Sequence, residues 1–115
     1  MKRYLLVILC LALGCGVCFA QSERKSVRRG NRQFKKEKYE EADISYRKAL
    51  MKDTSSVAAH YNLAGNLYRQ QNMEEAAKQL EAVQLTAGEE KNYVFLPESQ
   101  MKYALAIVKW AYSKI

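Results

Sequence analysis

The sequence predicts an all-α protein, built as a stack of antiparallel helix hairpins, and three observations support this fold class. Residues 57–84 place small and apolar side chains at the three- and four-residue spacing of an amphipathic helix. That spacing is interrupted near Gln71-Asn72, which divides the stretch into two short helices. An earlier copy lies 34 residues upstream, where Glu40-Glu41-Ala42 matches Glu74-Glu75-Ala76. We therefore expect two helix–turn–helix units followed by one C-terminal helix.

Residues 1–20 precede the first unit and have the pattern of a secretory signal peptide. Lys2 and Arg3 form a basic start, residues 5–20 are uncharged and mostly apolar, and Cys18 and Ala20 suit the small-residue positions of a cleavage site. We expect cleavage after Ala20 and export to the bacterial periplasm. The alternative is an uncleaved membrane anchor, although the run is shorter than the ~20 residues that a spanning helix needs.

All three cysteines (Cys10, Cys15 and Cys18) lie inside this segment, so a chain cleaved after Ala20 has no thiol for a disulfide or a metal site. Ala12-Leu13-Gly14-Cys15 resembles a bacterial lipoprotein box, in which the cysteine is lipidated. This resemblance leaves open an alternative in which Cys15 carries lipid and the protein is a structural tether of an envelope assembly.

The first unit spans residues 23–56, with helices expected over residues 21–38 and about 40–52. Small residues are expected where the helices of a pair approach closely, and larger ones fill the space between them. These structural positions are Gly30, Ala42, Tyr46 and Ala49 in the first unit, and Leu63, Ala64, Ala76 and Leu80 in the second. Ile44 and Leu50 are further candidates for burial on the second helix.

The second unit spans residues 57–88, with helices expected over 57–70 and 73–84 and a stop at Gly88. Residues 89–115 form a connector and, after Pro97, an apolar helix over 98–113. Its expected apolar face consists of Met101, Ala104, Leu105, Val108, Ala111 and Tyr112, widened by Tyr103, Ile107 and Trp110. This helix is either a cap across the second unit or the start of an incomplete third unit in a truncated product. It also offers a contact for a homodimer.

Basic residues are concentrated in the first unit. The chain carries a net charge of +7, and residues 21–52 hold eleven basic and five acidic residues. Such a surface is an ordinary solvated helix face, or it meets an acidic protein or lipid head groups. No nucleic acid partner is expected for an exported protein.

No catalytic set is visible in the sequence. His60 is the single histidine and has no second ligand at helical spacing, and no glycine-rich phosphate loop is present. Glu40/Glu41 and Glu74/Glu75 are adjacent in sequence, so the carboxylates of each pair point to different helix faces. We expect no enzymatic activity, no cofactor and no metal site.

A 34-residue period with a helix–turn–helix in each unit resembles the tetratricopeptide repeat (TPR) family. The departures are His60 where the family often has tryptophan, Glu37 in place of the turn glycine, and Thr54 in place of proline. The resemblance implies a concave groove, lined by the first helix of each unit, that binds an extended or helical peptide. The groove residues would be Asn31, Phe34, Lys35, Tyr61, Asn62, Tyr68 and Arg69. Val27 replaces the lysine of the chaperone-tail carboxylate clamp, so that ligand is not expected.

The signal peptide and two further segments together resemble the exported TPR proteins of the bacterial aerotolerance (Bat) group. The two segments are RRGNRQFKKEKYEEADISYRKAL and YNLAGNLYRQQNMEEA. This resemblance implies a protein partner in a membrane-associated assembly linked to oxidative stress.

Overall fold

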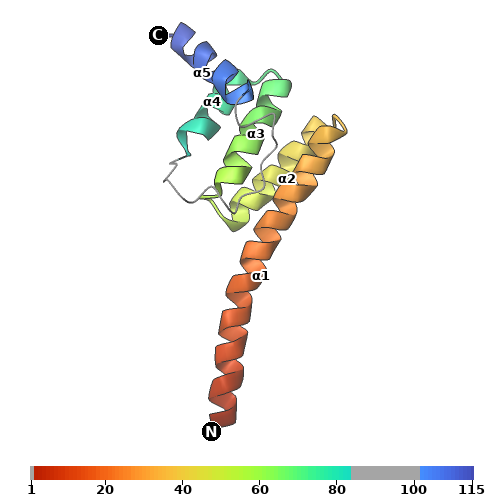
Figure 1. The fold of residues 1–115 in the computed structure, drawn as a ribbon, viewed down its shortest axis with the longest axis vertical. Helices are drawn as coiled ribbons and strands as arrows, with labels where there is room; N and C mark the ends of the chain where they lie inside the picture. Colours follow the sequence, from red (N-terminus) through yellow and green to blue (C-terminus); the bar gives the residue numbers. More distant parts are fainter. Residues whose placement is uncertain (1, 84–101) are drawn as a thin grey trace.

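The computed structural model describes residues 2–83 and 102–115; for residue 6 and residues 9–21 it describes the backbone but not the side chains. Five helices are present in these ranges, and consecutive helices pack on one another (Figure 1). They are α1 (Lys2–Lys35), α2 (Tyr39–Lys52), α3 (Val57–Arg69), α4 (Met73–Glu81) and α5 (Ala104–Ser113). No described residue is in a strand, which confirms the predicted all-α class.

Helix α1 is longer than predicted at one end and shorter at the other. It begins at Lys2 and continues without a break through Ala20, so its first half projects away from the other helices (Figure 1). It ends at Lys35, three residues before the predicted end. Helices α2 and α3 agree with the predicted bounds to within one residue, and α4 ends at Glu81 instead of residue 84. The predicted stop at Gly88, the connector and Pro97 lie outside the described residues.

The turns after α1 and α3 have the same hydrogen-bonded geometry. Glu37 and Gln71, 34 residues apart, both adopt a left-handed backbone, with φ of 61° and 63°. The Lys38 N–H donates to the Gln33 carbonyl at 2.9 Å, and the Asn72 N–H donates to the Leu67 carbonyl at 2.9 Å. These bonds, with those from the Glu37 and Gln71 N–H groups three residues back, form a Schellman motif at each helix end. The left-handed residue ends each helix, which explains why α1 stops at Lys35.

The core lies between the second half of α1 and helices α2 to α4. The expected structural positions Gly30, Ala42, Tyr46, Ala49, Leu63, Ala64 and Ala76 are buried, and Leu80 is partly buried against them. Gly30 is needed for a close approach, because a Cβ atom placed there would lie 2.5 Å from Cε1 of Tyr46. The prediction of burial was wrong for Ile44, which is 57% exposed. Ile44 lies two residues from Tyr46, and this separation turns it about 200° around the helix.

Helix α5 packs on α3 and α4, but not through the face that its sequence indicates. Tyr103, just before α5, and Ile107 are 5% and 1% exposed. Leu105, Val108 and Tyr112, expected on the packed face, are 57%, 43% and 72% exposed. Apolar side chains surround most of this helix, so composition does not distinguish its two sides. The i and i+4 pair Tyr103 and Ile107 provides the contact with the core.

Candidate interaction site

Two of the predicted groove residues lie in the core and do not line a groove. The Tyr46 hydroxyl donates to Asn31 Oδ1 at 2.7 Å, and Asn62 Nδ2 donates to the same oxygen at 2.9 Å. Asn31 and Asn62 are 8% and 0% exposed, so this network joins α1, α2 and α3 inside the protein. Burial raises the pKa of Tyr46 far above its usual value, which keeps the phenol protonated as the donor. The prediction that these two amides line a groove is therefore corrected.

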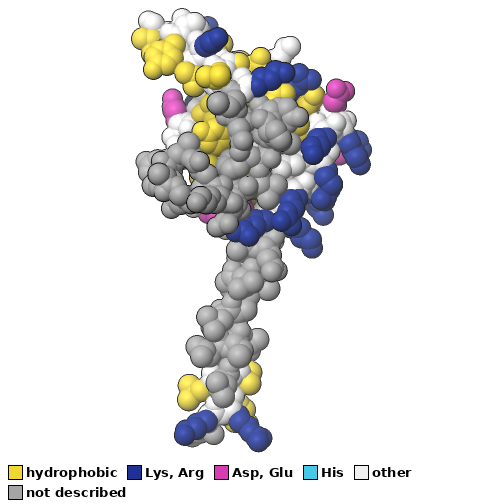
Figure 2. Space-filling model, in the orientation of Figure 1, with side chains coloured by type: hydrophobic (Ala, Val, Ile, Leu, Met, Phe, Trp, Pro, Cys, Tyr) yellow, Lys and Arg dark blue, Asp and Glu magenta, His cyan; other side chains and the backbone are white. Residues whose placement is uncertain are grey.

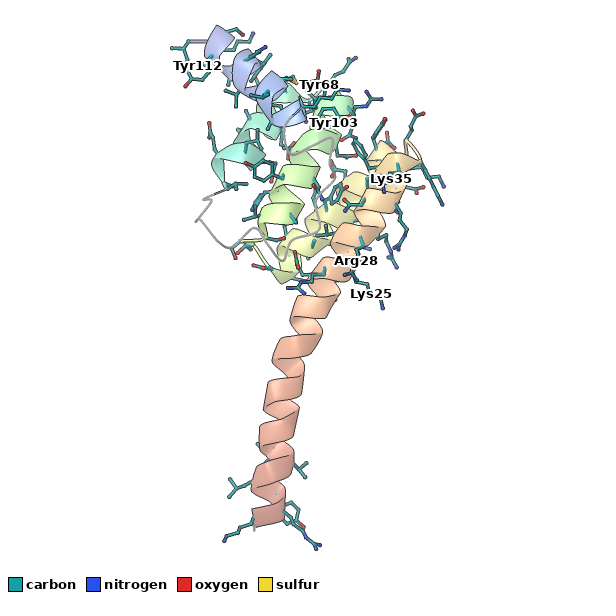
Figure 3. The ribbon with its side chains drawn as sticks, viewed as in Figure 1. Lys25, Arg28, Lys35, Tyr68, Tyr103 and Tyr112 are labelled. Atoms are coloured by element: carbon teal, nitrogen blue, oxygen red, sulfur yellow. The ribbon has the colours of Figure 1, made fainter. Side chains whose placement is uncertain are left out.

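Phe34 and Tyr68, both predicted to line the groove, each contact the ring of Tyr103, the residue just before α5. The Tyr103 ring centroid lies 6.1 Å from that of Phe34 and 5.1 Å from that of Tyr68. Tyr39 completes this aromatic cluster, with its ring centroid 5.5 Å from that of Phe34. Figure 3 shows Tyr103 beside Tyr68 at the end of α3. The cluster brings together α1, α2, α3 and the residue that precedes α5.

Arg69 lies at the exposed edge of the aromatic cluster. Its Nε–H donates to the Tyr39 hydroxyl at 3.1 Å, and Cζ lies 5.6 Å from the Tyr39 ring centroid. The hydrogen bond with Tyr39 is the main cause of a pKa for Arg69 above its usual value, so the guanidinium remains charged. Lys35, also predicted to line the groove, is exposed on the outer side of α1 (Figure 3). Tyr61 is partly buried and has contacts within the protein.

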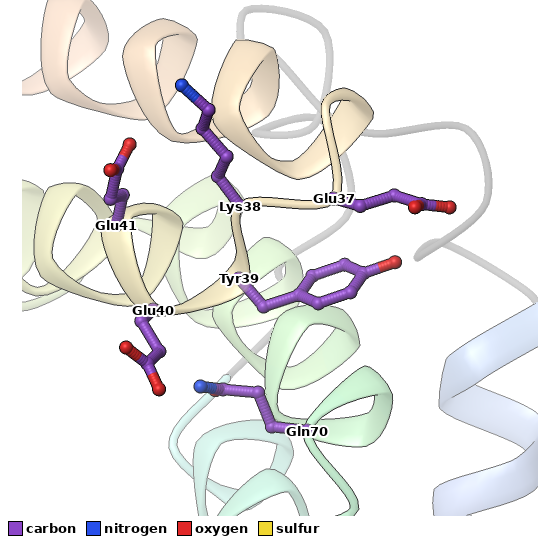
Figure 4. Close-up of a pocket in the computed structure, with 6 residues that line it drawn as sticks. All are labelled: Glu37, Lys38, Tyr39, Glu40, Glu41 and Gln70. Atoms are coloured by element: carbon purple, nitrogen blue, oxygen red, sulfur yellow. The ribbon is translucent and has the colours of Figure 1, made fainter.

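Two surface clefts flank the contact between Arg69 and Tyr39. The larger, of about 570 Å³, is shown in Figure 4 and is lined by Glu37, Lys38, Tyr39, Glu40, Glu41 and Gln70. The smaller, of about 330 Å³, is lined by Tyr68, Arg69, Gln71 and Met73. Five of the residues that line one or the other of these clefts are called the turn surface below: Tyr39, Tyr68, Arg69, Gln70 and Met73.

Sequence reasoning missed three residues of the turn surface: Tyr39, Gln70 and Met73. A signal for two of them was available, because Tyr39 and Met73 are 34 residues apart and each is the first residue of its helix. Both also pack against the buried cluster. The two large side chains therefore occupy equivalent places in the two units.

Polar side chains outside the turn surface also connect the helices through hydrogen bonds and ion pairs. The Arg47 guanidinium donates to Asp43 Oδ1 at 2.5 Å and to Glu75 Oε1 at 2.6 Å, which links α2 to α4. His60 Nε2 lies 2.9 Å from the Thr54 carbonyl oxygen, and Nδ1 lies 2.8 Å from Gln79 Oε1. His60 therefore connects α3 to α4 and to the preceding turn. Among the side chains that the structure describes, no three from acidic, histidine or cysteine residues are grouped as metal ligands.

Among the described residues, no helix is both long enough and apolar enough to cross a bilayer. Compared with protein-family models, with curated proteins and with solved structures, the chain matches none.

Proposed function

We propose that this chain is a non-catalytic, TPR-type interaction module of the bacterial cell envelope, and that it binds a peptide or helix of a partner protein. The turn surface is the proposed binding site. No cofactor takes part.

The repetition of the turn geometry is the observation that carries the TPR assignment. Helix pairs α1–α2 and α3–α4 each contain a Schellman turn, and the left-handed residues Glu37 and Gln71 lie one 34-residue period apart. Small buried residues recur with the same period, at Ala42 and Ala76 on the second helix of each pair. A turn with the same hydrogen-bond pattern reverses the chain at the same place in each pair, so repeated pairs can pack as neighbouring units.

The turn surface has the chemistry of a peptide-binding site. Tyr39, Tyr68 and Met73 offer apolar contact, and aromatic and arginine side chains supply much of the binding energy in protein interfaces. Within the described residues, Arg69 uses only Nε, toward Tyr39, and forms no ion pair. The two terminal nitrogens remain available for a carboxylate, which a planar guanidinium binds in bidentate fashion. We therefore infer that the partner segment carries an apolar side chain close to an acidic group.

The location in the cell envelope rests on the signal-peptide pattern of residues 1–20. The resemblance to the aerotolerance group favours a partner in a membrane-associated assembly that responds to oxidative stress. The signal-peptide pattern and this resemblance together support a protein as the binding partner, and not a nucleic acid.

A photo-crosslinking amino acid at Gln70 tests the proposed site in a bacterium that expresses the full chain. Gln70 lines the larger cleft, whereas Lys78 is exposed on α4 and provides a control position. We expect Gln70 to capture one envelope protein and Lys78 to capture none. Arg69→Glu should abolish the capture, while Lys78→Glu, which changes the charge equally, should preserve it. Equal capture at both positions, or capture that survives Arg69→Glu, would show that the turn surface is not the binding site.

A further inference from the structure

The exposed side chains of the second half of α1, and of Lys36 directly after it, are all of one kind. Between residues 22 and 36, every exposed residue is lysine or arginine. We call this set the cationic face; it consists of Arg24, Lys25, Arg28, Arg29, Arg32, Lys35 and Lys36. Lys25, Arg28 and Lys35 mark its length in Figure 3, and Figure 2 shows lysine and arginine side chains gathered over this part of the molecule.

The cationic face is wide, and no acidic side chain among the described residues forms an ion pair with it. At 100° per residue it covers about 140° of the helix circumference, and its 12 steps span roughly 18 Å. The acidic residue of this stretch, Glu23, is buried and accepts a hydrogen bond from the Ser56 hydroxyl. The ion pairs among the described residues involve Arg47 on α2, and none involves the cationic face.

The repulsion between these like charges destabilises the helix. Like charges four residues apart repel on a helix surface. The face contains four such pairs, which are Arg24/Arg28, Lys25/Arg29, Arg28/Arg32 and Arg32/Lys36. A face selected only for solubility would intersperse acidic residues, as α2 does with Glu40, Glu41 and Lys48. An external surface of negative charge would relieve the repulsion along the whole row.

We propose that the cationic face docks on the surface of an anionic phospholipid bilayer, with this part of α1 lying along the membrane. A row of lysine and arginine on one side of a helix matches a plane of phosphate groups, to which each cation near the surface contributes. The face contains no aromatic side chain on which the bases of a single strand could stack, so single-stranded nucleic acid is the weaker match.

Membrane docking leaves the turn surface accessible. The buried side of α1 faces α2 and α3, and the cationic face points away from them. Arg69 and Gln70, on the turn surface, belong to α3 and the turn that follows it. The proposal is therefore independent of the partner protein, and each can fail without the other.

Flotation of the full chain with phospholipid vesicles tests the proposal. Binding is compared between vesicles of phosphatidylcholine alone and vesicles with one third phosphatidylglycerol, at low and at physiological salt. Any contribution of the apolar N-terminal run is present with both lipids, so the ratio of the two affinities isolates the effect of charge. We expect a strong preference for the anionic vesicles that weakens as salt rises.

Two variants with equal charge removal locate the effect. Arg28→Gln with Arg32→Gln removes the centre of the cationic face, and at about fivefold per cation the anionic preference should fall about 25-fold. Lys78→Gln with Lys109→Gln removes two exposed charges from α4 and α5 and should leave the preference within about twofold of the unmodified chain. All substitutions are at exposed positions, and unchanged far-UV circular dichroism confirms folding.

Three results would overturn the proposal. The first is an equal affinity for both kinds of vesicle, and the second is an equal loss in the two double variants. The third concerns nucleic acid: the unmodified chain would bind a 30-base-pair DNA duplex more tightly than anionic vesicles at the same phosphate and salt concentrations. That result would assign the face to nucleic acid.

Discussion

Replacing Gly30 by alanine changes the free energy of unfolding in two opposite ways. The higher helix propensity of alanine raises it, and crowding in the core lowers it. In a helix interior, alanine is favoured over glycine by about 1 kcal/mol. At this position, however, the new Cβ would lie 2.5 to 2.9 Å from three atoms of the Tyr46 ring. Tyr46 is fully buried and its hydroxyl donates to Asn31, so the ring cannot move without disturbing the network.

The expected result is a net loss of stability. Overpacking of a buried site costs roughly 1–3 kcal/mol. Displacement of the Tyr46 hydroxyl adds about 0.5–1.5 kcal/mol for the weakened hydrogen bond. After subtraction of the gain in propensity, the free energy of unfolding should fall by about 2 kcal/mol. For a folded region of this size, the melting temperature would then fall by roughly 8–16 °C.

Urea unfolding followed by far-UV circular dichroism measures this change. The double variant Gly30→Ala with Tyr46→Leu is the matched control, because the smaller side chain makes room for the added methyl group. We expect Gly30→Ala to lower the free energy of unfolding much less in the Tyr46→Leu background than in the parent protein. If Gly30→Ala raised the free energy of unfolding by about 1 kcal/mol, as propensity alone requires, the close contact with Tyr46 would be refuted.

Three further predictions concern the core and α5. Tyr46→Phe should cost roughly 1 kcal/mol at pH 7 in urea unfolding, because one donor to the buried amide is lost. Burial raises the pKa of Tyr46, so the native state keeps a proton that the unfolded phenol releases above pH ~10. Stability should therefore fall above that pH, and the phenylalanine variant should lack this part of the decline; a decline of the same size in both proteins would contradict the assignment. Ser56→Ala should cost about 1–3 kcal/mol, since it removes the cap to the Ala59 N–H and leaves the buried Glu23 carboxylate without this donor. Ile107→Ala should cost about 2–4 kcal/mol by thermal unfolding and Leu105→Ala less than about 1 kcal/mol, and the reverse order would show that α5 packs by its other face.

The features predicted well from the sequence are those set by neighbouring residues. The bounds of α2 and α3 follow from local periodicity and from polar breaks such as the cap at Ser56. The small buried positions, such as Ala42 and Ala76, follow from the 34-residue repetition. Glu37 was identified as standing in place of a turn glycine, and its positive φ shows that the turn keeps the glycine-like backbone.

The features that were missed depend on residues far apart in the chain. Asn31 was predicted to line a groove because of the resemblance to the TPR family, but the Tyr46 hydroxyl, on another helix, donates a hydrogen bond to it in the core. The packed face of α5 was misjudged, since apolar side chains lie on both sides of that helix and only the tertiary contact chooses Ile107 over Leu105. The aromatic cluster also requires Tyr103, which lies beyond the region where the repeat can be aligned.

The position of Tyr103 has a consequence for any measured affinity. Because Tyr103 belongs to the same chain, it is a tethered competitor for Phe34 and Tyr68, with an effective concentration on the order of millimolar. A partner that inserts a side chain between the rings of Phe34 and Tyr68 must first displace the ring of Tyr103. The apparent dissociation constant is then the intrinsic one divided by the fraction of molecules in which Tyr103 has left. Substitutions in α5 that weaken its packing would thus tighten such binding, although the partner never touches the substituted residue.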